Sequence, residues 1–309
     1  MGTTPGRDAF QILAELLRAR SGLSIGPDKL YLLETRLAPI IRREGLGDLA
    51  GLAQRLGAPA SEPLACEVVE AMTTNESFFF RDDKPFAHVR AKALPRLLLA
   101  RPPGTPIRIW SAAASSGQEA YSLAMIAAEL GAGKRVEIVG TDIARAQLAR
   151  ARNGLYTQFE VQRGLPIQLL VKHFRKEEDR WRVAAPLREM VRFQEWNLLA
   201  DPAPLGRFDI VFCRNVLIYF DQPTKARVLD AIARQLPEDG LLYLGGAETV
   251  LGLTTQFAPL PEDRSVYSKG AASPTSIPSQ PRASNRPVSP ARSSTVVVSD
   301  STIAGPCRA

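Results

Sequence analysis

The sequence predicts an α/β domain that follows a smaller all-helical domain, and three observations indicate this. Apolar residues recur at helical spacing from Asp8 to about Met72. Beyond Pro106, short apolar runs alternate with amphipathic stretches, which is typical of a parallel sheet covered by helices. The 309 residues are 45% hydrophobic and 23% charged, a balance that lets a chain bury one or two cores and excludes collagen and coiled coils.

The amino-terminal domain is expected to cover residues 1–84 and to contain four helices. Apolar residues repeat every three or four positions in three stretches, and a fourth helix is expected from Pro63 to Met72. Breaks with glycine or proline separate the stretches at Gly22, Gly26–Pro27, Gly45 and Gly57–Pro59. Pro27 suits the first turn of the second helix, because the N–H that proline lacks is not needed there.

The α/β domain is expected over residues 85–269, with strands and helices in alternation. The predicted strands are Ile107–Ser111, Val136–Asp142, Phe208–Cys213 and Gly240–Gly245. The predicted helices are Gly117–Leu130, Ala144–Arg152 and Thr224–Leu236. Because the strands alternate with helices, we expect them to run parallel in one sheet.

A small antiparallel β-subdomain is expected to interrupt this order at about residues 175–196. The segments Trp181–Pro186 and Met190–Phe193 alternate polar and apolar residues with a period of two. Ala185–Pro186 would form the turn between them. We therefore expect a β-hairpin inserted in the α/β domain.

The composition of the chain limits its other features. Residues 270–309 are rich in Ser, Pro and Arg, so we expect a disordered tail there. Three widely spaced cysteines and two histidines give neither a disulfide framework nor a zinc site, so no metal is expected. No run approaches the roughly 18 to 20 apolar residues that cross a bilayer. We expect a cytoplasmic protein without membrane insertion, whose net charge of +7 favours an acidic partner.

A run of small residues, Ser111–Glu119, joins the first strand to its helix. The sheets of α/β proteins bind their cofactors at this position. The run lacks the G-x-G-x-x-G spacing that brings backbone close to a pyrophosphate, whereas S-adenosylmethionine has no phosphate and needs only small side chains. Glu119 would then accept hydrogen bonds from the cofactor. The other interpretation is that the small residues only let the helix pack closely on the strand.

Polar residues also end the second and third strands. Asp142 follows the small-residue run by about 25 positions, near the spacing of a ribose-binding carboxylate, although it would also cap the next helix. Arg214 and Asn215 come directly after an apolar strand, where polar groups usually face a ligand. Cys213 has no nearby histidine partner, so we expect it to pack in the core. The two histidines, His88 and His173, are expected to be surface or packing residues.

Five segments carry motifs that occur in a fixed order along the chain. They are Thr73–Asp82, Trp110–Ser122, Thr141–Ile143, Trp196–Leu199 and Phe212–Asp221. Together they resemble the motif series of the CheR family, the chemotaxis receptor glutamate O-methyltransferases. The resemblance covers about residues 8 to 269, and five motifs in register are far more specific than a single glycine-rich loop.

The resemblance implies an all-α amino-terminal domain, a Rossmann-like methyltransferase domain with a small antiparallel β-subdomain, and S-adenosylmethionine as cofactor. It implies that the cofactor is held by Asn75, Ser77, Arg81, Glu119, Asp142, Asn197, Leu198, Arg214 and Asn215. Ser77 stands where the family often has threonine. The implied activity is transfer of a methyl group to glutamate side chains in the cytoplasmic helical domain of a chemoreceptor, which leaves S-adenosylhomocysteine.

Arg81 and Tyr219 are the residues that the resemblance places nearest to the reacting groups. A glutamate carboxylate, with an ordinary pKa of about 4.3, is already an anionic nucleophile, so positioning matters more than acid–base catalysis. A cation and a phenol would hold the incoming carboxylate. The alternatives are that Arg81 binds only the cofactor and that Tyr219 only packs in the core.

Two other functions stay open beside this one. They are a non-catalytic module that binds S-adenosylmethionine or a receptor, and a methyltransferase that acts on RNA. The chain has no dense Lys/Arg stripe interleaved with aromatic residues, so we expect no nucleic acid partner. Arg36, Arg42 and Arg43 on the second helix either face solvent or dock on an acidic receptor surface.

Overall fold

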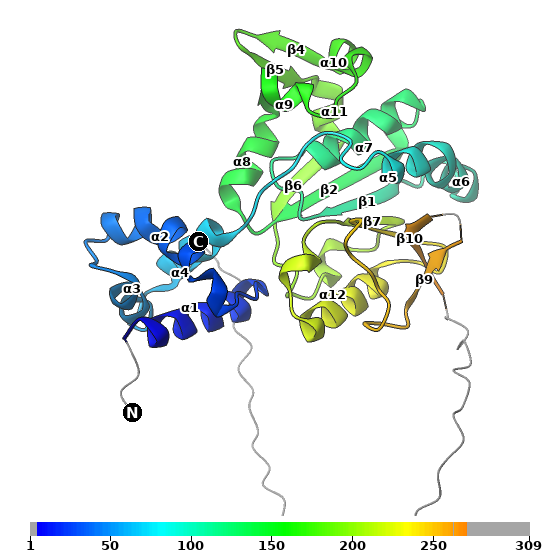
Figure 1. Cartoon of the computed structure of the whole chain (residues 1–309). Helices are drawn as coiled ribbons and strands as arrows, with labels where there is room; N and C mark the ends of the chain where they lie inside the picture. The colour runs from blue at the N-terminus through cyan, green and yellow to red at the C-terminus, as the bar shows by residue number, and fades with distance from the viewer. Residues whose placement is uncertain (1–4, 262, 271–309) are drawn as a thin grey trace, which may run out of the picture.

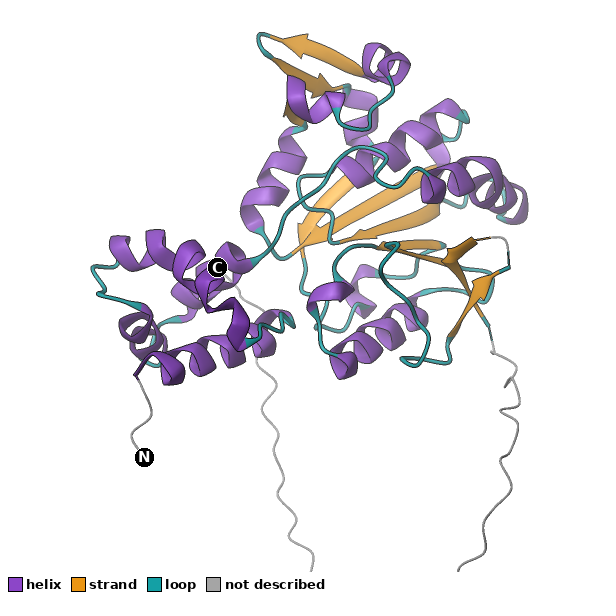
Figure 2. Ribbon diagram, viewed as in Figure 1, coloured by secondary structure: helices purple, strands orange, loops and turns teal. Residues whose placement is uncertain are grey.

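The computed structural model describes residues 5–261 and 263–270. Within these ranges a helical domain lies beside an α/β domain, and a small antiparallel sheet projects from the α/β domain (Figure 1, Figure 2). The predicted disordered tail lies outside the described residues from residue 271 onward. No helix in the described part of the chain combines the length and the apolarity needed to cross a membrane. The predicted domain limits, 1–84 and 85–269, stay predictions.

The amino-terminal domain contains the four expected helices around one apolar core. They are α1 (Pro5–Ser21), α2 (Leu30–Arg43), α3 (Leu49–Leu56) and α4 (Glu62–Met72). Their apolar faces meet at fully buried side chains such as Leu33 and Leu37. Pro27 opens a 3-10 turn directly before α2. The Asp48 carboxylate caps α3 by accepting a hydrogen bond from the Gly51 N–H at 2.9 Å.

The α/β domain is built on a seven-stranded sheet with the order β6-β2-β1-β7-β8-β10-β9. Its strands are β1 (Ile107–Ala112), β2 (Val136–Asp142), β6 (Val191–Glu195), β7 (Ile210–Cys213), β8 (Leu241–Leu244), β9 (Phe257–Leu260) and β10 (Asp263–Lys269). The pairs from β6 to β8 are parallel, and β10 is antiparallel to β8 and β9. The four predicted strands therefore lie next to one another in the parallel part of the sheet.

Helices cover both faces of this sheet (Figure 2). One core contains residues of α5 (Lys84–His88), a π-helical turn (Val89–Ala93), α6 (Leu94–Ala100), α7 (Gln118–Glu129) and α8 (Arg145–Asn153), and the other contains residues of α12 (Gln222–Gln235). Short 3-10 turns lie at Gly133–Arg135, Ala203–Leu205 and Leu217–Tyr219. Neighbouring side chains of β1 alternate between the cores, with Ile109 in the first and Trp110 in the second. Burial on both faces explains why the strands are continuous apolar runs.

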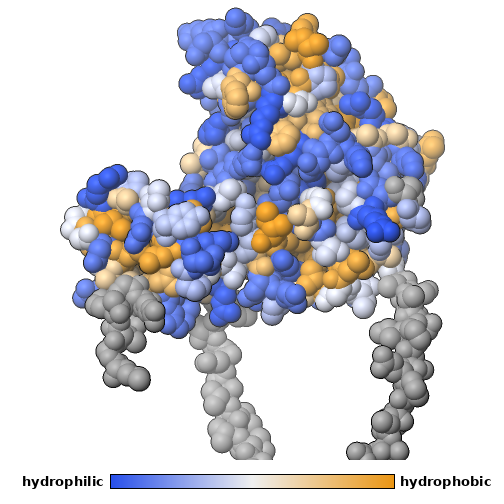
Figure 3. Space-filling view, in the orientation of Figure 1, coloured by the Kyte–Doolittle hydropathy of each residue, from blue (hydrophilic) through white to orange (hydrophobic). Residues whose placement is uncertain are grey.

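The small sheet is antiparallel, with the strand order β3-β5-β4. It is formed by β3 (Leu155–Thr157), β4 (Phe174–Glu177) and β5 (Arg180–Val183), with α9 (Gln158–Gln162) and α10 (Ile167–His173) in the connection from β3 to β4. Hydrophilic residues cover most of its visible face (Figure 3). The sheet thus begins at residue 155 and ends at 183, whereas the sequence placed it at about 175–196.

The predicted hairpin between Trp181–Pro186 and Met190–Phe193 is wrong. Residues 185–189 form the helix α11 (Ala185–Glu189), with proline in its first turn, and the following strand β6 pairs in parallel with β2 at the edge of the large sheet. An alternation with a period of two predicts which side chains of a strand share a face. It does not predict which other strand pairs with it. Here Phe193 lies opposite Gly140, where the missing side chain leaves room for its ring.

Gly140→Ala tests this placement of β6. A methyl group at Gly140 would lie 2.6 Å from ring carbons of Phe193 and 3.2 Å from the Cβ of Ala114. We expect the free energy of unfolding to fall by about 1–3 kcal/mol, because the ring or the strand has to move. Gly133→Ala is the matched control, since its nearest atom is the Met190 sulfur at 3.5 Å. Equal stability of the two variants in chemical denaturation would contradict the pairing.

Candidate active site

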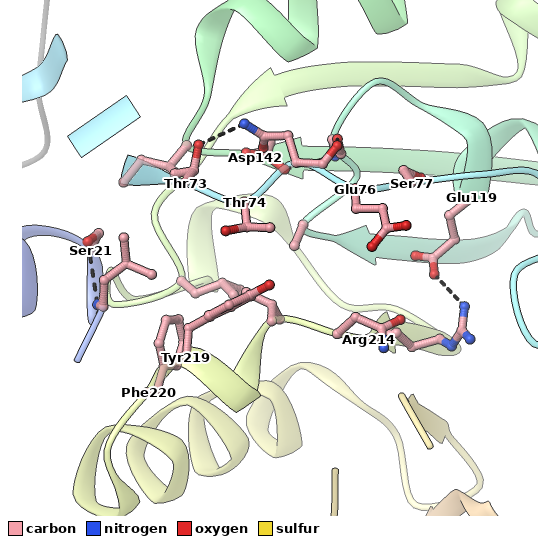
Figure 4. A pocket seen from close by; sticks show the side chains of 18 of the residues that line it. Ser21, Thr73, Thr74, Glu76, Ser77, Glu119, Asp142, Arg214, Tyr219 and Phe220 are labelled. Atoms are coloured by element: carbon pink, nitrogen blue, oxygen red, sulfur yellow. Dashed lines mark hydrogen bonds and ion pairs between the residues drawn. The ribbon is translucent and has the colours of Figure 1, made fainter. Parts of the chain in front are cut away.

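A pocket lies at the carboxyl ends of β1, β2 and β7, between the two domains (Figure 4). Its wall includes the loops after these strands, the residues that follow α1 and the segment between α4 and α5. All ten residues that the sequence placed in the site line this pocket: Asn75, Ser77, Arg81, Glu119, Asp142, Asn197, Leu198, Arg214, Asn215 and Tyr219. Parallel strands bring their carboxyl ends to one edge of the sheet, so residues far apart in the sequence meet there.

The loop after β1 holds backbone conformations that are rare for residues with a side chain. Ala113 and Ser115 have φ angles of 88° and 49°, and Gly117, which precedes α7, has a φ angle of 95°. A Cβ at Gly117 would lie 2.9 Å from that of Ala151 and 3.0 Å from the ring of Phe193. The small residues therefore let α7 pack closely on the sheet. Ala113 and Ser115 also line the pocket, and binding of a cofactor by this run stays a prediction.

The Asp142 carboxylate connects the loops after β1 and β2. Its two oxygens accept hydrogen bonds from the Ser115 N–H at 2.8 Å and the Ala144 N–H at 2.9 Å. Burial raises the pKa of this carboxyl, and the amide donors oppose the rise. Ala144 directly precedes α8, so Asp142 supports the start of that helix while it lines the pocket.

The guanidinium of Arg214 connects three segments of the pocket wall. It donates to two carboxylates, Glu119 at 3.1 Å and Asp82 at 2.7 Å, and to the carbonyl oxygen of Arg81 at 2.9 Å. The Ser111 hydroxyl donates to the other oxygen of Glu119 at 2.7 Å. Burial raises the pKa of Glu119, and the charge of Arg214 opposes the rise. The Arg214 side chain is 1% exposed, so the ion pair with Glu119 is a buried one (Figure 4).

The segment between α4 and α5 brings Asn75, Ser77 and Arg81 to the pocket. The Asn75 side chain donates to the hydroxyl of Thr73 at 2.8 Å. The Arg81 guanidinium donates to the carbonyl oxygen of Glu76 at 3.0 Å, which uses one of its five N–H groups. This segment is thus held by its own polar contacts while its side chains line the pocket.

The two domains meet beside the pocket. The Asn197 side chain donates to the carbonyl oxygen of Arg20 near the end of α1. The Ser24 N–H donates to the carbonyl oxygen of Tyr219 at 2.8 Å. The half-buried ring of Tyr219 packs against the core that contains residues of α12, and its hydroxyl points into the pocket (Figure 4). Both domains therefore contribute to the pocket wall.

The cysteine and the histidines discussed above lie outside the pocket wall. Cys213 is fully buried, and burial raises the pKa of its thiol well above the ordinary value, which leaves it unreactive. His88 shares a hydrogen bond with the Tyr243 hydroxyl at 2.8 Å, and His173 shares one with Glu129 at 2.8 Å. Both histidines are thus hydrogen-bonded within the fold, outside the pocket.

Two of the three arginines considered for receptor docking have contacts within their own domain. Arg36 donates to the carbonyl oxygen of Met72 at 2.7 Å, at the end of α4. Arg43 forms an ion pair with Glu67. Arg42 is exposed on the same helix. Glu67 balances the charge of Arg43, and Arg36 is turned toward the end of α4. This face of α2 therefore offers a partner less positive charge than its three arginines suggest.

Glu248, which lies shortly after β8, is important for the site and was not found from the sequence. Its Oε2 accepts hydrogen bonds from the N–H groups of Asn215 at 2.8 Å and Gly245 at 2.7 Å. Its Oε1 accepts from Val216 at 2.9 Å and Leu217 at 2.7 Å. Asn215 has a φ angle of 58°, a strained conformation that these bonds hold in place. An acidic residue just after a buried strand was the one signal in the sequence.

Two buried donors in the pocket wall have no hydrogen-bond partner among the residues that the structure describes. They are Nε1 of Trp196 and Nε of Arg214. A buried donor without a partner is costly, so a polar ligand group that reached either donor would gain a hydrogen bond there. Together with the carboxylates of Glu119 and Asp142, they suit a ligand that carries amino, hydroxyl and carboxyl groups. S-adenosylmethionine has this set.

The fold and the site together define a methyltransferase that uses S-adenosylmethionine. Acidic residues lie at the carboxyl ends of the strands, and the loop after β1 lacks the glycine spacing of a dinucleotide site. The chain belongs to the CheR methyltransferase family. The sequence model of the all-alpha domain of CheR methyltransferases matches residues 8–73, and that of the SAM binding domain matches residues 75–266.

Similar proteins carry consistent names. The chemotaxis protein methyltransferase Cher2 of Pseudomonas putida is 39% identical over 255 residues, which cover 80% of this chain and 92% of the relative. Chemotaxis protein methyltransferase 1 of Pseudomonas aeruginosa is 40% identical over 255 residues, which again cover 80% of this chain and 92% of the relative. Among solved structures, PKMT2 from Rickettsia typhi in complex with AdoHcy aligns with a TM-score of 0.33 and 12% identity over 56% of this chain and 26% of that one.

Glu248→Gln tests the contribution of the buried carboxylate. Glutamine has a single acceptor oxygen and turns N–H donors toward backbone N–H groups. We expect a loss of about 2–4 kcal/mol in the free energy of unfolding and weaker binding of S-adenosylhomocysteine. Glu238→Gln is the control, because Glu238 is 84% exposed. A Glu248→Gln protein with the melting temperature of the control would show that the four hydrogen bonds contribute little.

Proposed function

We propose that this methyltransferase transfers the methyl group of S-adenosylmethionine to glutamate side-chain carboxylates of a chemoreceptor. The products are a glutamate methyl ester and S-adenosylhomocysteine. The observation that carries the proposal is that ten expected residues, from the segment before α5 and from the loops of the α/β domain, line one pocket. The names of the similar proteins, which are chemotaxis protein methyltransferases, support a chemoreceptor as the substrate.

In this proposal the ends of β1, β2 and β7 hold the cofactor. Asp142 and Glu119 accept hydrogen bonds from its hydroxyl and amino groups, and Arg214 donates to it. The remaining wall includes the other expected cofactor residues, Asn75, Ser77, Arg81, Asn197, Leu198 and Asn215. Bound there, S-adenosylmethionine supplies a methyl group that is bonded to a positively charged sulfur. The sulfur leaves as a neutral thioether, so the leaving group needs no proton.

Arg81 and Tyr219 act on the substrate side. The glutamate carboxylate is ionised at neutral pH, so no general base has to remove a proton. The Arg81 guanidinium attracts this anion, and the Tyr219 hydroxyl, which points into the pocket, donates a hydrogen bond that orients it (Figure 4). Holding the reacting groups in line can contribute several kcal/mol, so positioning accounts for the main effect of these two residues.

The partner in this proposal is the cytoplasmic helical domain of a chemoreceptor. Because both domains contribute to the pocket wall, a receptor helix that presents a glutamate to the pocket touches both of them. Arg42, exposed on α2, offers a positive charge to an acidic helix surface.

A transfer assay with methyl-labelled S-adenosylmethionine tests the reaction. We expect label on the receptor that is released by mild alkali, because a carboxyl methyl ester hydrolyses there. Alkali-stable label, or label on RNA, would contradict the glutamate substrate. Cofactor binding without any transfer would favour a non-catalytic module.

The pH dependence of cofactor binding tests Glu119. Burial raises the pKa of this carboxyl above the ordinary glutamate pKa of about 4.3. Glu119 is therefore protonated at a higher pH than an exposed glutamate. The ionised form accepts the hydrogen bonds, and therefore the affinity for S-adenosylhomocysteine falls as the pH falls through the raised pKa. We expect Glu119→Gln to bind roughly tenfold more weakly at neutral pH, with a flatter profile. A variant with the wild-type profile in calorimetric titrations would remove Glu119 from the cofactor site.

A further inference from the structure

The rim of the pocket holds a carboxylate that the proposed mechanism does not use. Glu76 lies next to Asn75 and Ser77 in the sequence, and its carboxylate points into the pocket (Figure 4). Arg163, from the loop between α9 and α10, donates from Nη2 to Oε1 of Glu76 at 2.5 Å. The side chain of Glu76 is 53% exposed, so solvent and other molecules can reach this ion pair.

Two arginines approach one aromatic ring at this rim. The guanidinium carbon of Arg163 lies 4.3 Å from the ring centroid of Phe78, and that of Arg81 lies 5.4 Å from it. Both distances permit a cation–π interaction. The hydrogen bond from Arg163, and the charges of Arg163 and Arg81, lower the pKa of Glu76. This part of the rim therefore favours an ionised carboxylate.

The backbone fixes Arg163 in this place. The next residue, Gly164, has a φ angle of 84°, and a Cβ there would lie 2.0 Å from the carbonyl oxygen of Phe79. A residue with a side chain does not fit. The loop between α9 and α10 thus lies directly against the segment that carries Arg81, and the base of the Arg163 side chain is held beside Phe78.

We propose that Arg163, together with Arg81, binds the carboxylate of the substrate glutamate, and that Glu76 occupies this place until the substrate arrives. The inference rests on the proposed function, which brings the same chemical group to the same rim. An exposed ion pair contributes little net stability, so exchanging one carboxylate for another costs little. Arg163 is then a residue that selects acidic side chains, and Glu76 is an internal competitor of the substrate.

Two variants that each remove one charge should act in opposite directions. Arg163→Gln removes a binding group, so the KM for the receptor rises roughly fivefold. Glu76→Gln removes the competitor, so the KM falls roughly threefold. In the double variant, Glu76→Gln no longer lowers the KM, because the arginine that it would free is absent. Arg163→Lys keeps the charge and should recover part of the affinity.

Arg150→Gln is the matched control. Arg150 lies on α8, is 50% exposed and forms an ion pair with Glu160 at 2.7 Å, so the variant loses the same charge from a similar ion pair elsewhere. If Glu76→Gln and Arg163→Gln both raise the KM and lower the melting temperature, the pair only joins two loops and the proposal is wrong. An Arg163→Gln enzyme with the KM of the control also overturns it. Wild-type enzyme that puts no alkali-labile label on the receptor would instead reject the proposed function.

Discussion

The pocket depends on the ion pairs and hydrogen bonds of the buried Arg214 guanidinium. A charge removed from water costs several kcal/mol unless opposite charges and acceptors compensate it. Glu119 and Asp82 compensate it here, and the carbonyl oxygen of Arg81 accepts a further hydrogen bond. Because these acceptors come from α7 and from the segment before α5, the end of β7 cannot move without both. One ion-pair network thus holds three distant parts of the chain in register.

Two further carboxylates give the loops at the strand ends their shape. Loops without regular secondary structure leave backbone N–H groups that need acceptors, and an ionised carboxylate offers about four acceptor positions and no donor. Asp142 binds two such groups, from Ser115 and Ala144, and Glu248 binds four. Acidic residues at this edge of the sheet therefore hold the loops that form the wall of the pocket.

Much of this arrangement could be predicted from the sequence, because strands buried on both faces are plain apolar runs and the polar residues that follow them meet at one edge. The partner of β6 could not be predicted, since it depends on space for Phe193 beside Gly140. The contacts of Glu248 and Arg163 could not be predicted either. Glu248 binds Asn215 across 33 positions, and Arg163 reaches Glu76 across 87. No local pattern records contacts at such separations.

The shared wall of the pocket also bears on how the protein unfolds. Hydrogen bonds such as those from Asn197 to Arg20 and from Ser24 to Tyr219 join the domains beside the pocket, while each domain has an apolar core of its own. A ligand that touches both sides adds its binding free energy to that contact. We expect such a ligand to make the two domains unfold more nearly as one cooperative unit. Release of a product that touches both domains would, in the same terms, remove this added coupling.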